Sequence, residues 1–109
     1  MSETIKVLGQ SAPGATTDTD VYTVPADESA VISTIVIANR GATAGSFRLA
    51  VRPAGATIAD EHYVAFDVPI AGNDSTTLTL GITMDETDVL TFQASTADMS
   101  VNVFGTELS

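Results

Sequence analysis

Few residues of the chain are of the types that carry catalysis, and they form no recognised constellation. The 109 residues include one histidine, His62, and no cysteine. A serine nucleophile needs a histidine base beside it, often on a strained turn, and the sequence contains no G-x-S-x-G elbow. We interpret His62, which follows Glu61, as a surface residue at the start of a strand. The sequence therefore predicts a protein that is not an enzyme.

Carboxylates are abundant, and three of them lie close together along the chain. Asp85, Glu86 and Asp88 fall in one predicted turn. Calcium takes oxygen ligands that such a loop supplies, although no segment matches an EF-hand pattern. Asp side chains also cap β-turns by accepting hydrogen bonds from nearby backbone amides. We expect turn capping here, with these residues as weak calcium candidates, and we predict no cofactor.

Three of the four cationic side chains are arginines, Arg40, Arg48 and Arg52. Arg48 and Arg52 share one face of a predicted strand whose other residues on that face are small. A guanidinium binds a carboxylate through paired hydrogen bonds, within a subunit or across to another. A bridge inside the subunit is one expectation. The other is a contact between subunits, for which these three arginines are the candidate interface residues.

The charge balance excludes some classes of partner. Fourteen acidic residues outweigh four basic ones, for a net charge of −10. Four cations cannot form a patch that follows the phosphates of a nucleic acid, so we predict no nucleic-acid partner. No apolar run approaches the roughly 20 residues of a membrane helix, and the start MSETIKVLGQ lacks the pattern of a secretory signal. We therefore predict no membrane partner.

The elements that must position these residues are predicted to be β-strands. Thr, Val and Ile are frequent, and apolar residues alternate with polar ones between turn signals. Short connections favour antiparallel neighbours. The sequence predicts an all-β fold, an antiparallel two-sheet sandwich of jelly-roll or immunoglobulin-like type with seven or eight strands. The expected strands are 5–8, 21–24, 30–38, 46–52, 62–68, 76–82, 88–95 and 99–104.

Two regions follow from this pattern, an extended N-terminal arm over residues 1–20 and a sandwich domain over residues 21–109. The arm is expected because residues 9–20 are small, polar and aperiodic. In the domain, alternation predicts that Leu78, Leu80 and Ile82 point inward. Most of the six aromatic side chains also fall on inward faces, which favours core packing over a sugar-binding platform. These are Tyr22, Phe47, Tyr63, Phe66, Phe92 and Phe104.

Several segments resemble small virion structural proteins of tailed bacteriophages, of the marine and freshwater type. The resemblance runs from Gln10 to Leu108 through TVPA, NRGATAGSFRLAVRPAGA, TLGIT, TDVLT and the ending VNVFGTEL. These segments carry no catalytic residue, so the resemblance implies a structural part. It implies a small β-sandwich that decorates or cements the head, or that belongs to the tail, baseplate or fibre.

The resemblance also implies where the protein acts and with what. We expect a virion protein, assembled in the host cytoplasm, that binds the major capsid protein or other virion proteins. Because long edge strands invite further pairing, we also expect a homo-oligomer, a trimer or larger. A carbohydrate-binding or host-surface-binding module is the alternative from another class, and it requires an exposed aromatic platform or a calcium loop.

Overall fold

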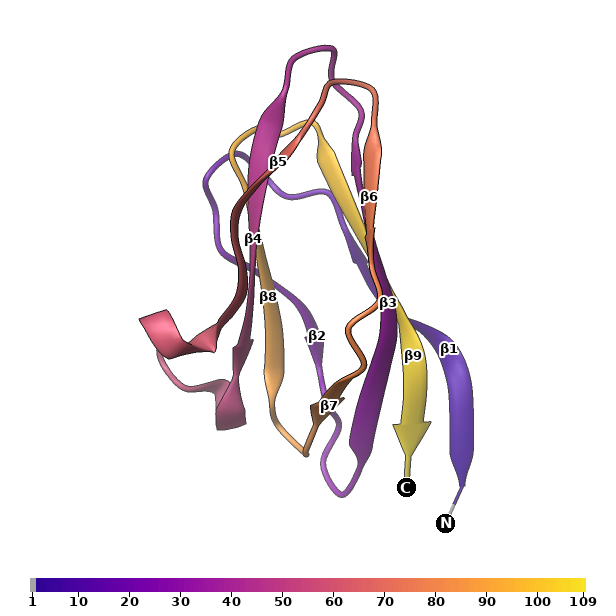
Figure 1. Cartoon of the computed structure of the whole chain (residues 1–109). Helices are drawn as coiled ribbons and strands as arrows, with labels where there is room; N and C mark the ends of the chain where they lie inside the picture. The colour runs from indigo at the N-terminus through magenta and orange to yellow at the C-terminus, as the bar shows by residue number, and fades with distance from the viewer. Residues whose placement is uncertain (1) are drawn as a thin grey trace.

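Two antiparallel β-sheets pack face to face and enclose one core (Figure 1). This arrangement, seen in a computed structural model that describes residues 2–109, confirms the predicted two-sheet sandwich. The strands are β1 (Glu3–Ser11), β2 (Thr19–Thr23), β3 (Ser29–Asn39), β4 (Gly45–Arg52), β5 (Tyr63–Ile70), β6 (Ser75–Leu78), β7 (Ile82–Met84), β8 (Val89–Ala94) and β9 (Met99–Leu108).

The strands pair in a nested order. In one sheet the order is β1-β9-β3-β6, with β7 also paired to β3, and in the other it is β2-β8-β4-β5. Thus the first strand pairs with the last, the second with the last but one, and β4 with β5 at the centre of the nest. This is the strand order of a jelly roll and not of an immunoglobulin-like sandwich. Because β6 and β7 pair with successive parts of β3, they share one strand position of the roll.

The core lies between the sheets and is built from alternate residues of the central strands. On β4, Phe47 and Leu49 are buried, as the alternation predicts. Phe47 stacks on Phe92 of β8, with 6.1 Å between ring centroids. Strand β9 contributes Met99, Val101 and Val103 from the opposite sheet. Burial of these large apolar side chains supplies the main stabilisation of the fold.

Much of the predicted N-terminal arm is a strand, β1, of the sandwich. Residues Glu3–Ser11 pair with β9 along their whole length, so this part of the expected arm 1–20 belongs to the sandwich. Residues 5–8 were expected as a short strand, but its pairing with β9 was not, because the side chains from Glu3 to Val7 are exposed and show no core-facing pattern. Within the expected arm, residues 12–18 between β1 and β2 form no strand, and residue 1 lies outside the described residues.

The expected strand 76–82 is interrupted. Strand β6 ends at Leu78 and β7 begins at Ile82, with Gly81 between them at a φ of +62°. This left-handed conformation suits glycine and breaks the alternation. Leu80 is therefore 50% exposed instead of pointing inward, whereas Met84, which lies between two of the expected strands, is buried on β7.

The connection between β4 and β5 contains short 3-10 turns at Pro53–Gly55 and Asp60–His62. These are the helical elements of residues 2–109, and neither has the length or the apolar character needed to cross a membrane.

Candidate functional site

Strand β5 is bulged where it faces Arg48. The register between β4 and β5 shifts between Phe47 and Leu49, so that Phe66 and Asp67 together face the single residue Arg48. Asp67 has a φ of +52°, in the left-handed region. A bulge of this kind places two residues opposite one and re-aims their side chains. The outer face of the four-stranded sheet thus acquires an acidic and an aromatic group beside the same arginine.

The bulge lets both of these groups bind Arg48. Nε of Arg48 donates to Oδ1 of Asp67 at 2.7 Å, and Nη2 donates to Oδ2 at 3.3 Å. The guanidinium also lies 4.0 Å from the centre of the Phe66 ring, a cation–π contact. The hydrogen bonds from Arg48 lower the pKa of Asp67 below its usual value. Arg48 is therefore held in place by its own subunit.

An apolar patch lies next to this arginine on the edge strand β5. Phe66 is 54% exposed and Val64 is 46% exposed, in contrast to the inward position predicted for most of the aromatic residues. The ring of Tyr63 meets that of Phe66 edge-to-face, with 4.9 Å between centroids. The alternation pattern missed this patch because the bulge shifts the phase of the strand at Phe66.

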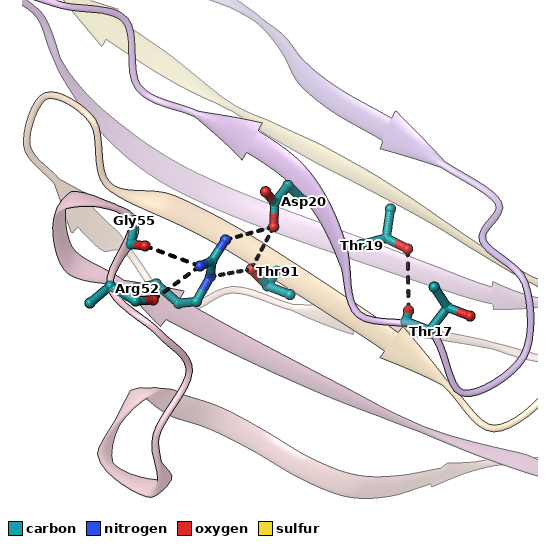
Figure 2. A network of polar contacts seen from close by, with 7 residues as sticks. Thr17, Thr19, Asp20, Arg52, Gly55 and Thr91 are labelled. Atoms are coloured by element: carbon teal, nitrogen blue, oxygen red, sulfur yellow. Dashed lines mark hydrogen bonds and ion pairs between the residues drawn. The ribbon is translucent and has the colours of Figure 1, made fainter.

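Arg52 forms the centre of a second polar network on the same sheet face (Figure 2). Nε donates to Oγ1 of Thr91 at 3.0 Å, and Nη2 donates to Oδ1 of Asp20 at 2.8 Å. Nη1 donates to the carbonyl oxygens of Gly55 and Ala56 at 3.2 and 3.0 Å. These bonds join β2, β4 and β8 to the link that follows β4. The arrangement is a structural clamp whose donors are engaged within the subunit.

Arg40 lies apart from the other two arginines. It follows β3 in the opposite sheet, where its Nη2 donates to the carbonyl oxygen of Ala97 at 3.2 Å. Arg48 and Arg52 are separated by four positions on β4, roughly 13 Å along the strand. The structure therefore does not bring the three candidate interface arginines into one cluster. The expected bridge within the subunit is present for Arg48 and Arg52, and their contact with another subunit stays a prediction.

The three acidic residues proposed as weak calcium candidates accept hydrogen bonds from backbone amides. Asp88 accepts from the amides of Ala54 and Asp85, each at 2.9 Å. Asp85 caps the amide of Glu86 at 2.8 Å, and Glu86 caps that of Asp27 at 2.8 Å. Within residues 2–109 no group of three or more His, Cys, Asp or Glu side chains is placed to hold a metal ion. Turn capping accounts for these carboxylates.

His62 also has a structural partner. Its Nδ1 accepts a hydrogen bond from the backbone amide of Ala59 at 3.0 Å, within the 3-10 turn that precedes β5. This hydrogen bond ties the imidazole ring to the turn that leads into β5.

A buried carboxylate at one end of the sandwich was not predicted from the sequence. Glu107 is only 8% exposed, and its Oε2 accepts the hydroxyl hydrogen of Tyr22 at 2.7 Å. Nζ of Lys6 lies 2.9 Å from Oε1 of the same carboxylate. The hydrogen bonds from Lys6 and Tyr22 lower the pKa of Glu107, while burial raises the pKa of Tyr22. This triad ties β2 of one sheet to β1 and β9 of the other.

The inward pattern Met99, Val101, Val103 continues through Gly105 to Glu107, which is the signal that could have revealed this buried acid. The expected last strand, 99–104, ends before Gly105 and therefore does not include the carboxylate.

Comparisons with protein-family models, with curated proteins and with solved structures found no match.

Proposed function

We propose that the chain is a non-enzymatic structural subunit of a tailed-bacteriophage virion. In this role it decorates the outside of the head and stabilises it through contacts with the major capsid protein and with other copies of itself. The resemblance of the segments between Gln10 and Leu108 to virion structural proteins supports this proposal. The jelly-roll strand order is a supporting analogy, since the same architecture serves in viral capsid and lectin domains.

The observation that carries the proposal is the placement of the exposed apolar residues. The five large apolar residues that are exposed within residues 2–109 include four on the outermost strands β1 and β5. They are Ile5, Val7, Val64 and Phe66, and the fifth is Leu80. Arg48, Arg52 and His62 meanwhile hold structural partners. Apolar groups at sheet edges and polar groups engaged internally suit a subunit that works by binding neighbours.

The location in the particle is tested by counting copies of the chain. Purified virions of the phage that encodes it are analysed by quantitative mass spectrometry against the major capsid protein. We expect a copy number comparable with that of the major capsid protein. A few copies per particle would move the protein to the tail, baseplate or fibre, and its absence from intact particles would refute the virion role.

The contribution of Arg48 to assembly is tested with charge variants. Arg48→Glu places a negative charge beside Asp67 and removes the cation from the Phe66 ring. Because an exposed ion pair adds little to stability, the variant should fold but bind empty capsids less well. Arg48→Lys, which keeps the charge, serves as the matched control. If Arg48→Glu binds capsids as well as the native chain does, Arg48 has no role in capsid binding and serves only in the ion pair within the subunit.

A second candidate function is carbohydrate or host-surface binding, and the exposed Phe66 ring favours it. Aromatic faces stack on sugars, but here the guanidinium of Arg48 already lies against that ring. A glycan array with the native chain and with Phe66→Ala, each with and without calcium, tests this function. Binding that Phe66→Ala abolishes supports it, and a blank array dismisses it.

A further inference from the structure

Three of the four sheet edges carry features that discourage pairing with another chain. Strand β5 has two register shifts against β4 and contains Pro69, which lacks an N–H. Strand β2 is short, and its register against β8 shifts at Val21. The carbonyl group of Val21 also lies against Gly9 of β1. The edge formed by β6 and β7 is broken at Gly81. Each of these edges is interrupted, so none offers a long regular ladder.

Strand β1 also has a register shift, between Val7 and Gly9, but the part of the strand before it is regular. Its part from Glu3 to Val7 pairs with β9 in unbroken register, and all five residues are exposed. In Figure 1 this strand forms the outer boundary of its sheet, beside β9. Ile5 is 83% exposed and Val7 is 46% exposed, and both lie on the same side of the strand. An exposed edge with branched apolar side chains is a template for adding another strand.

The backbone groups of this edge that face away from β9 can be identified. Ser2 and Ser109 exchange both of their backbone hydrogen bonds, at 2.9 and 3.0 Å. In an antiparallel ladder such pairs alternate with pairs whose N–H and C=O groups point to the other side. Glu3, Ile5 and Val7 therefore direct their N–H and C=O groups outward, away from β9.

We infer that two copies of the chain pair through β1, antiparallel, about a two-fold axis at Ile5. In this register Ile5 faces its own symmetry mate, and Glu3 faces Val7 of the second copy. All of these residues have outward N–H and C=O groups, so each facing pair exchanges both of its main-chain hydrogen bonds. The two sheets that contain β1 become one continuous sheet, and the exposed Ile5 side chain gains a neighbour.

A second copy fits this edge better than another occupant for two reasons. The pattern of outward groups at Glu3, Ile5 and Val7 is symmetric about Ile5, so the edge is complementary to itself. The segment also holds one acid and one base, Glu3 and Lys6, so it does not add to the repulsion expected between chains of net charge −10. Lys6 is moreover already paired with Glu107.

The pairing closes at two subunits. A strand that pairs with its own copy forms an isologous contact, whereas a ring of three needs β1 to meet a different edge. The interrupted edges of β2, β5, β6 and β7 do not provide one. The inference thus replaces the expected trimer or larger assembly with a dimer for the chain in solution. It does not rest on the virion role, because the dimer forms in solution without a capsid, but it would supply the contact between copies of the chain that the virion role includes.

The test uses the full chain in sedimentation and light-scattering measurements over a range of concentrations. The native chain should reach twice its 11.2 kDa mass. Ile5→Lys puts like charges opposite each other across the axis and should return the mass to that of one chain. Leu80→Lys is the matched control, because Leu80 is similarly apolar and exposed but lies away from β1. It should leave the dimer intact.

Ile5→Pro provides an independent variant. It removes an N–H that points away from β9, so the β1–β9 ladder should be retained while the dimer is lost. The melting temperature should match that of the native chain at concentrations low enough for the native chain to be monomeric. Hydrogen exchange on the native chain should show concentration-dependent protection of the amides of Glu3, Ile5 and Val7. A native chain that stays monomeric at high concentration, or an oligomer that Ile5→Lys and Ile5→Pro leave intact, would overturn the inference.

Discussion

Removal of the Tyr22 hydroxyl tests the buried triad at the end of the sandwich. In Tyr22→Phe the ring remains, but Oε2 of Glu107 loses its hydrogen bond of 2.7 Å. A hydrogen bond to a charged group contributes about 1.5–3 kcal/mol, and the carboxylate that loses it here is buried. An unfolding entropy of about 2.1 cal/mol/K per residue over 109 residues gives about 0.23 kcal/mol/K. The melting temperature should therefore fall by about 6–13 °C.

The stability lost in Tyr22→Phe should depend on pH in a direction that follows from the pKa of Glu107. Lys6 and Tyr22 lower the pKa of folded Glu107 from its ordinary 4.5. The stabilisation that accompanies a lowered carboxyl pKa is fully present above pH 4.5 and is lost as the pH falls through the lowered value. The difference between the native chain and Tyr22→Phe should consequently be largest near neutral pH and shrink in acid.

The assay is thermal unfolding and urea unfolding at a series of pH values, both followed by circular dichroism. Tyr63→Phe is the matched control, because it removes the same hydroxyl from a half-buried tyrosine whose ring packs against the exposed Phe66. Tyr63→Phe should lower the free energy of unfolding by less than about 1 kcal/mol. Equal stability of the two variants at neutral pH, or a loss in Tyr22→Phe that does not change with pH, would refute the role of the triad.

Further predictions concern the core, the turns and metal binding. Phe92→Ala should lower the free energy of unfolding by about 3–5 kcal/mol in urea titrations, because the ring is fully buried against Phe47, whereas Phe66→Ala should cost far less. Asp88→Ala should cost about 1–2 kcal/mol in the same assay, since the amides of Ala54 and Asp85 lose their caps. Calcium addition or chelation should leave the melting temperature unchanged in differential scanning calorimetry, and a clear rise with calcium would restore the calcium candidates.

The sandwich was predictable because its signal is local. On β4 the inward residues Phe47 and Leu49 alternate with polar ones, and that pattern alone defines a strand with one buried face. The nested pairing has no such signal, because it depends on which distant strands meet. The same holds for β1, whose exposed side chains from Glu3 to Val7 show no core face and whose partner β9 lies at the other end of the chain.

The candidate site was less predictable because small shifts in register decide it. The shared face of Arg48 and Arg52 followed from their spacing, but the partners of Arg48 depend on the bulge at Phe66 and Asp67. Strict alternation cannot place two successive residues beside one arginine. Glu107 was missed for the opposite reason, since the alternation extended further than the strand that was expected.

The nested strand order also has a consequence for the speed of folding. Strands β4 and β5 are joined by residues 53–62 alone, whereas pairing Glu3 with Leu108 closes nearly the entire chain into a loop. Loop closure loses more entropy as the loop lengthens, and proteins dominated by distant contacts fold in milliseconds to seconds. We expect refolding in that range, with the hairpin of β4 and β5 forming early and β1 joining the sheet last.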